Sequence, residues 1–419
     1  VASYRKALTL KPDYAEAYYN MGNVIRGVVF SRPVSGLGNM IYKLLEKGKF
    51  VRPRDVAPAT ISLLKFEPII KATIIKHCEG KLPQSVQETI LELSNIPLLI
   101  KLMEVCPIPD LEFEAVFRDI RSEVLLAISR EKSDFKILPF QISLALQCFT
   151  NEYLYDITDI ELTPLQNLED RVEKQLIDGE QPNPNELACL ASYKALYEYS
   201  WIHLLTMPIE LEALRHRQIL EPQIETKSRL KIPILQEIKN NISSKVREQY
   251  EQNPYPRWVN VKKELSSKPI SKITKDSKLN IINLSINEVT APQILIAGCG
   301  TGQHSIETAS RFKGCNVLAI DLSLSSLAYA KRKTEELSIS NIEYMQADIL
   351  DLEFLNRKFD VIESVGVLHH MDDPMAGWQI LTDSLKPGGL MRIGLYSEIA
   401  RRHIVQIHDE IKKLNIDSS

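Results

Sequence analysis

The sequence predicts a multidomain protein of the α and α/β classes, helical in its first part and built on a doubly wound parallel sheet in its last part. Between Gly80 and Gly298 only Gly179 interrupts a glycine-free stretch, whereas nine of the sixteen glycines lie between Gly298 and Gly394. That last part also alternates apolar runs with polar helical stretches, which is typical of strands and helices in a parallel sheet.

Composition excludes several classes of protein. At 419 residues, with 44% hydrophobic and 25% charged residues, the chain is long enough for more than one core. Its net charge of -3 indicates no nucleic-acid partner. No apolar run reaches the roughly 20 residues that a membrane span needs. The six cysteines are scattered, without metal or disulfide spacing, so we expect no metal site and a cytoplasmic location.

Residues 1–33 predict the remnant of an array of tetratricopeptide repeats. Because about three repeats are needed to bury a core, we expect further repeats before this segment. Such repeats usually bind peptides, so a protein or peptide partner is expected here. The residues at the spacing of the repeat are Tyr4, Ala7, Pro12, Ala15, Tyr18, Met21 and Gly22.

Two further regions precede the sheet. Residues 34–245 predict one all-helical domain, since apolar residues recur there at spacings of three and four, for example in 86–105 and 113–128. Residues 246–291 contain the string EQNPYPRW and a stretch rich in Ser, Lys and Asn that lacks periodicity. This region predicts a linker or a lid.

Residues 292–419 predict the doubly wound sheet. Its apolar runs are nearly continuous, as expected for strands covered by helices on both faces. In such sheets ligands bind beyond the carboxyl ends of the strands, so we expect the chemistry in the loops that follow the runs. The runs are QILIAG (293–298), NVLAID (316–321), IEYMQAD (342–348), FDVIES (359–364) and GGLMRIGLY (388–396).

Four of these loops carry residues that suit one nucleoside-bearing ligand. Glycines after the first run let backbone amides approach a ligand closely, and an acid after the second run can accept hydrogen bonds from two ribose hydroxyls. A nicotinamide dinucleotide is disfavoured, because the last position of its G-x-G-x-x-G pattern is Gln303 here. The loop positions are Gly298, Gly300, Gly302, Asp321, Asp348 and Ser364.

In five ordered motifs this part of the chain resembles class I S-adenosylmethionine-dependent methyltransferases, of the bacterial type that carries tetratricopeptide repeats. The motifs are ILIAGCGTGQHS, LAIDLS, QADIL, FDVIESVGVLHHMDDP and LKPGGLMRIGLYS. The resemblance implies a Rossmann-like fold with S-adenosylmethionine as cofactor. It places the glycine loop at the methionyl part, Asp321 at the ribose, Asp348 and the backbone of Ile349 at the adenine, and Ser364 beside the sulfonium, and it adds Leu322 to the residues that bind the cofactor.

The reaction that this resemblance implies is methyl transfer to an acceptor, for which a protein or peptide recruited by the repeat and helical region is expected. His369 and His370 are candidates for the base, since imidazole titrates near neutral pH, although one could cap the loop and the other pack. Metal binding with Asp372 or Asp373 is disfavoured, because adjacent histidines point in different directions. The alternative function is a non-catalytic interaction scaffold with a methyltransferase-like cofactor-binding module.

The end of the sequence departs from the family pattern. Class I methyltransferases continue after the fifth strand with a helix and an antiparallel hairpin, whereas residues 398–419 read as a helix. We therefore expect a domain truncated at its C-terminus, with the fifth strand as an exposed edge.

Overall fold

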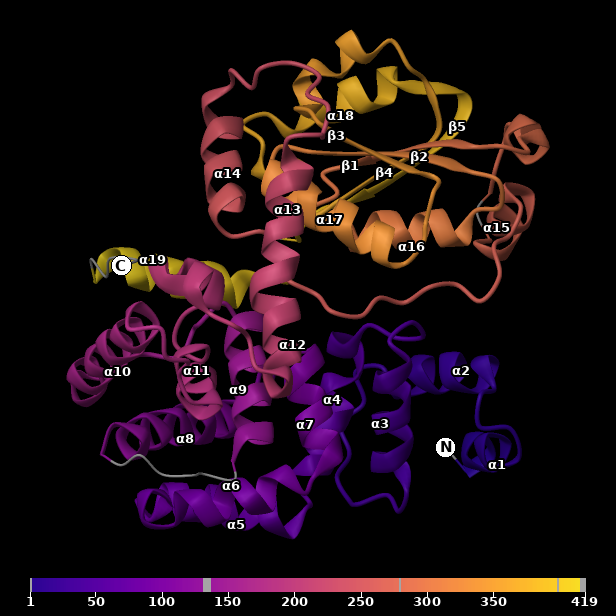
Figure 1. Ribbon diagram of the computed structural model, residues 1–419. Coiled ribbons are helices and arrows are strands. Elements are labelled where there is room, and N and C mark those ends of the chain that lie inside the picture. Colours follow the sequence, from indigo (N-terminus) through magenta and orange to yellow (C-terminus); the bar gives the residue numbers. More distant parts are fainter. Residues whose placement is uncertain (1, 131–136, 279, 398, 415–419) are drawn as a thin grey trace. The chain divides into compact units, whose positions relative to one another are not determined.

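A computed structural model describes the chain except for a few short segments (Figure 1). None of the described helices is both long and apolar enough to cross a membrane. All six cysteines are free thiols. The described residues are 2–130, 137–278, 280–397 and 399–414.

Contacts within the chain divide it into two compact units. Unit 1 comprises Val1–Ile224 and Arg257–Leu265, and unit 2 comprises Glu225–Pro256 and Ser266–Ser419. The chain therefore enters unit 2, returns to unit 1 for a short segment and then completes unit 2. The predicted division at residues 33, 245 and 291 stays a prediction.

Every regular element in the described part of unit 1 is a helix, as the apolar periodicity predicted. Proline begins several of these helices, at Pro53, Pro68, Pro97 and Pro184, because its missing N–H is not needed in a first turn. The string 86–105 accordingly forms two helices, α6 (Val86–Ser94) and α7 (Pro97–Val105).

The other helical elements of this part of the chain are α1 (Ala2–Leu10), α2 (Ala15–Ile25), α3 (Leu37–Lys47), α4 (Pro53–Leu64), α5 (Pro68–Cys78), η1 (Leu82–Ser85), α8 (Leu111–Arg130), α9 (Leu138–Thr150), α10 (Asp159–Ile177), α11 (Pro184–Leu190), η2 (Leu196–Glu198), η3 (Ser200–Leu204), η4 (Ile209–Leu211), α12 (Glu212–Arg215) and η5 (His216–Leu220). The unit boundary falls within α13 (Glu221–Arg229).

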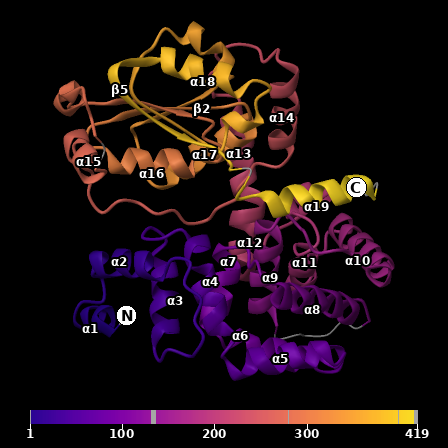
Figure 2. The same ribbon diagram turned by 180° about the vertical axis from the view of Figure 1, so that it is seen from behind.

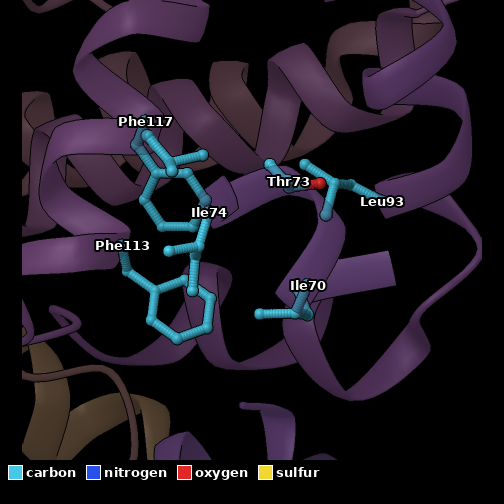
Figure 3. A pocket seen from close by; sticks show the side chains of 7 residues that line it. Ile70, Thr73, Ile74, Leu93, Phe113 and Phe117 are labelled. Carbon is cyan, nitrogen blue, oxygen red and sulfur yellow. The ribbon is translucent and has the colours of Figure 1, made fainter. Parts of the chain in front are cut away.

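One continuous apolar core fills unit 1, and Phe117 and Phe140 are among its fully buried side chains. A small cavity lies between α5, α6 and α8 (Figure 3). Its lining is apolar except for one threonine, so it offers almost no hydrogen-bonding groups to a ligand. The lining residues are Ile70, Thr73, Ile74, Leu93, Phe113, Val116 and Phe117.

A buried polar network links α8 to α10 in unit 1. Arg121 and Glu161 are both almost inaccessible, and their closest side-chain atoms, Nη2 and Oε1, lie 3.6 Å apart. The hydroxyl of Tyr193 donates to Oε1 of Glu161 at 2.6 Å, and Nη1 of Arg121 donates to the carbonyl oxygen of Tyr155 at 3.2 Å. Because each charge has partners, the pair is tolerated inside the core.

Unit 2 contains the predicted parallel sheet. Its described strands are β1 (Gln293–Ala297), β2 (Asn316–Asp321), β3 (Ile342–Gln346), β4 (Phe359–Val365) and β5 (Leu385–Gly394), in the order β3-β2-β1-β4-β5. All four pairings are parallel. The prediction of a doubly wound, Rossmann-like sheet is thus confirmed. The strand order reverses at β1, and ligands bind at the carboxyl edge beside such a reversal.

Helices cover both faces of this sheet (Figure 1). Ile294 and Ile296 of β1 share one core with α16 (Gln303–Arg311) and α17 (Leu324–Glu336). Leu295 and Ala297 share the other core with α18 (Pro374–Asp383), η7 (Ile349–Leu355) and η8 (Leu368–His370). Successive side chains of a strand point to opposite faces, so both sets must be apolar and the run is continuous.

The segment before the sheet also belongs to unit 2. Pro233 and Leu235 exchange two backbone hydrogen bonds of 2.9 Å with Gln346, so this segment covers the outer edge of β3. The next helix, α14 (Asn241–Gln252), packs against α17 (Figure 2). The remaining helical elements are α15 (Ile270–Asp276), η6 (Leu284–Glu288) and α19 (Arg402–Lys413).

Candidate functional site

The loop from β1 to α16 places three glycines at the carboxyl edge of the sheet. Gly298, Gly300 and Gly302 have φ angles of 74°, 51° and 84°. A Cβ at Gly298 would lie 2.3 Å from Val367, and one at Gly302 would lie 2.5 Å from a side chain of α17. At Gly300 the nearest described atom is the carbonyl oxygen of Tyr255, at 3.5 Å. Packing therefore demands glycine at the first and third positions, whereas the middle position has room beside it.

Asp321 ends β2 and reaches the glycine loop. Its Oδ2 accepts from the amide of Gly300 at 2.7 Å, and its Oδ1 accepts from the amide of Ser323 at 3.0 Å. Burial raises the pKa of Asp321, and the hydrogen bonds from these backbone amides oppose that rise. Each carboxylate oxygen has a second lone pair, so Asp321 can still accept hydrogen bonds from hydroxyl groups. These free acceptor positions therefore fit the hydroxyl groups of a ribose.

Three further residues predicted to bind the cofactor, Asp348, Ile349 and Leu322, have structural roles of their own. Oδ1 of Asp348 accepts from the amide of Leu350 at 3.0 Å and caps η7. Ile349 is buried in the apolar core on the α18 face. The carbonyl oxygen of Leu322 accepts from Nε2 of Gln346 at 2.7 Å. Contact of these residues with a cofactor stays a prediction.

Ser364 and the two histidines follow one another along β4 and its loop. In the part of the chain that the structure describes, the buried hydroxyl of Ser364 and both ring nitrogens of His369 have no hydrogen-bond partner. The ring of His369 lies 4.3 Å from that of His370 and 3.9 Å from that of Tyr396, measured between centroids. Burial lowers the pKa of both histidines, and the charge of Arg401 lowers both further. Both imidazoles are thus able to accept a proton near neutral pH.

The structure also reveals a buried carboxylate that the sequence reasoning missed. Oε2 of Glu363 lies 2.7 Å from both Nε2 of His304 and Oγ1 of Thr308, and Oε1 accepts from Nη2 of Arg311 at 2.6 Å. Burial would raise the pKa of Glu363, but the hydrogen bond from His304 and the charge of Arg311 lower it to about 2. Glu363 thereby ties β4 to α16 directly after the glycine loop. The sequence feature that could have indicated this residue is the presence of an acidic side chain inside the apolar run FDVIES.

A second feature of the site is the contact of residues 250–256 with the same loops, in the region where the sequence predicted a linker or a lid. Oγ1 of Thr301 donates to the carbonyl oxygen of Pro256 at 2.7 Å. Burial raises the pKa of Tyr250, and the nearby charge of Asp321 raises it further. The string EQNPYPRW was the only sequence signal for this contact, since the segment has no periodicity.

Two parts of the chain match known protein families. Residues 294–389 match the family described as a methyltransferase domain, and residues 1–25 match the family described as a TPR repeat. The first match contains almost the whole sheet and the loops after β1 to β4, but not residues 250–256. This part of the chain is a methyltransferase domain of the class that uses S-adenosylmethionine, as the resemblance predicted, and the N-terminal segment is a tetratricopeptide repeat.

The similar proteins cover only parts of this chain. An uncharacterised protein of Synechococcus is 38% identical over 124 residues, which are 29% of this chain and 30% of that protein. Phosphoethanolamine N-methyltransferase 1 of Arabidopsis thaliana is 30% identical over 125 residues, 30% of this chain and 25% of that protein. Ubiquinone biosynthesis O-methyltransferase of Actinobacillus pleuropneumoniae is 30% identical over 149 residues, 34% of this chain and 61% of that protein.

The solved structures that resemble this chain include that of Haemonchus contortus phosphoethanolamine N-methyltransferase 2, in complex with phosphomonomethylethanolamine and S-adenosylhomocysteine. The two sequences are 28% identical, and the match covers 28% of the present chain and 29% of the Haemonchus protein, with a TM-score of 0.24. The present chain thus spans less than two thirds of the length of the relatives that it matches.

Proposed function

We propose that this chain is an S-adenosylmethionine-dependent methyltransferase whose cofactor site is formed by the loops after β1 to β4. The observation that carries the proposal is the 2.7 Å hydrogen bond from the amide of Gly300 to Oδ2 of Asp321. It supports a single site made of the glycine loop and the acid of the second strand. In this site Asp321 accepts from the ribose hydroxyls, while Asp348 and Ile349 border the base.

When bound, S-adenosylmethionine supplies a methyl group on a sulfonium that is already activated toward nucleophiles. The tasks of the chain are therefore to align the acceptor and to remove a proton where the acceptor carries one. His369 and His370 are neutral near pH 7 because burial lowers the pKa of each, so either imidazole can take that proton. The buried hydroxyl of Ser364 borders the same loop.

For the acceptor we propose a protein or peptide that is recruited by the repeat and helical region. The match of residues 1–25 to the TPR repeat family supports this choice. The names of two relatives point instead to small acceptors, phosphoethanolamine and intermediates of ubiquinone biosynthesis. For the location of the protein we propose the cytoplasm, because its six cysteines are free thiols. A screen for the acceptor therefore includes peptides and both kinds of small molecule.

Calorimetric titration of the whole chain with S-adenosylmethionine, and separately with NAD, tests the cofactor. We expect binding of S-adenosylmethionine alone. Asp321→Ala should abolish it, because a hydrogen bond to a charged group contributes about 1.5 to 3 kcal/mol and the ribose offers two hydroxyls. Asp409→Ala, on the exposed helix α19, serves as the control. Binding of neither ligand would refute the proposal, and binding without transfer to any acceptor would favour the scaffold.

A further inference from the structure

We propose that Glu251, on α14, is a positioning residue that holds the loop of Asp321 in the conformation needed for cofactor binding. This inference rests on the function proposed above and assigns part of that site to a helix outside the matched segment 294–389. No hydrogen bond joins Glu251 to Asp321 in the part of the chain that the structure describes, although the nearby charge of Glu251 adds to the rise that burial causes in the pKa of Asp321. Glu251 acts through Ser323, which follows Asp321 by two residues in the chain.

The contacts of Glu251 with the loop are direct. Its Oε2 lies 2.8 Å from the hydroxyl of Ser323 and accepts from the amide of Ser325 at 3.0 Å. The hydroxyl of Ser323 also lies 3.0 Å from the carbonyl oxygen of Tyr250 and accepts from the amide of Ser326 at 3.0 Å. Ser323 is thereby fixed on one side by α14 and on the other by the first turn of α17.

Ser323 passes this constraint on to the site. Its amide donates to Oδ1 of Asp321, while the amide of Gly300 donates to Oδ2. A series of hydrogen bonds therefore runs from Glu251 through Ser323 and Asp321 to the glycine loop. Because an Asp side chain swings about two torsions, fixing the amide beside one oxygen also limits where the other oxygen can point.

Glu251 is itself held in place. Its second oxygen pairs with Arg229 of α13, and its side chain is only 25% exposed. Another pair, Arg332 of α17 with Glu225 of α13, has Nε and Oε1 2.8 Å apart. The first pair joins α14 to α13 and the second joins α13 to α17, so the carboxylate of Glu251 approaches the loop from a fixed direction.

A second loop of the site meets the same segment. Thr301, next to Gly300, donates its hydroxyl proton to the carbonyl oxygen of Pro256 at 2.7 Å. Residues 250–256 therefore contact both the glycine loop and the loop of Asp321. We single out Glu251 because its contact is made by a side chain and can be removed without altering the backbone.

The test combines amide hydrogen exchange with calorimetric titration on the whole chain. In Glu251→Ala we expect faster exchange in the peptides that carry Gly300 and Ser323, and about tenfold weaker binding of S-adenosylmethionine, as for one lost hydrogen bond to a charged group. Glu251→Gln retains an acceptor and should show a smaller loss. Glu248→Gln, exposed on the same helix, should leave both quantities unchanged.

A double-mutant cycle separates positioning from general loosening. If Glu251 acts through Ser323, then Glu251→Ala combined with Ser323→Ala should weaken binding no more than the worse single variant. Additive losses would overturn the proposal. So would unchanged exchange, or faster exchange with wild-type affinity. Should Glu251→Ala fail to fold, the cycle is run with Glu251→Gln.

The two readouts also separate this inference from the proposed function. If the wild-type chain does not bind S-adenosylmethionine, the cofactor assignment fails. Exchange still decides whether Glu251 orders the loop: faster exchange in Glu251→Ala supports that role, and unchanged exchange refutes it.

Discussion

Asp321 and Glu363 are two carboxylates at the same sheet whose pKa values move in opposite directions. Burial raises the pKa of Asp321, and mainly backbone amides oppose that rise. At Glu363 an imidazole and a guanidinium overcome the same effect of burial. The difference fits their surroundings, since Glu363 has its charge balanced by the fold, whereas Asp321 keeps acceptor capacity for a ligand with hydroxyl groups.

Glu363 should make stability depend on pH at the acid end. Its pKa of about 2 in the folded chain lies below its ordinary value of 4.5. The unfolded chain therefore takes up a proton first, and the free energy of unfolding should fall by about 3 kcal/mol as the pH drops from about 4.5 to about 2. Denaturant titrations of Glu363→Gln should lack this contribution. Glu343→Gln, in an exposed pair with Arg357, provides the control.

His370→Ala should lower turnover while leaving the affinity for S-adenosylmethionine nearly unchanged. General-base catalysis contributes about 10² to 10⁴ in rate, so a loss of that order is expected with an acceptor that must give up a proton. Since burial lowers the pKa of His370, the acid limb of kcat should lie below pH 6.5. The same measurement on His408→Ala, on the exposed helix α19, controls for the loss of an imidazole elsewhere in the chain. Wild-type turnover in His370→Ala would remove this residue from the mechanism.

At the scale of the element, the sequence predicted the strands better than their ends. All five apolar runs form strands, yet β5 begins at Leu385, earlier than the predicted Gly388, since its pairing with β4 extends the ladder. The packing of α14 against α17 could not be predicted, because contacts such as that of Glu251 with Ser323 join residues that are 72 positions apart in the sequence. Glu363 was missed for a similar reason, since its partners on α16 become visible only once β4 lies beside β1.

The glycine loop offers a comparison of two substitutions within one element. Gly302→Ala would place a Cβ 2.5 Å from Ala330, so it should destabilise the protein and lower its Tm. Gly300→Ala meets only the carbonyl oxygen of Tyr255, at 3.5 Å. Gly300→Ala should therefore lower the free energy of unfolding by only about 1 to 2 kcal/mol, because the residue has a positive φ. Its main effect should be weaker binding of S-adenosylmethionine. Thermal melts and titrations of both variants check this, and unchanged affinity in Gly300→Ala would argue against a ligand at that position.

At the scale of the whole molecule, the chain holds separate apolar cores. One core lies wholly in unit 1, and the two cores on the faces of the sheet lie in unit 2. The sequence predicted this separation through its uneven use of glycine. It could not predict that residues 257–265 return to unit 1, because that depends on contacts such as the one between Nζ of Lys262 and Oδ1 of Asn23, 2.8 Å apart.

Separate cores should respond separately to a core substitution and to the cofactor. Phe117→Ala removes a fully buried ring from unit 1 and should cost about 3 to 5 kcal/mol. S-adenosylmethionine at 100 times its Kd should stabilise unit 2 by about 2.7 kcal/mol. Scanning calorimetry should therefore show one transition lowered by Phe117→Ala and another raised by the cofactor, the second shift vanishing in Asp321→Ala. If both changes shift a single shared transition, the two units unfold together, and binding of the cofactor in unit 2 also stabilises the helical unit 1.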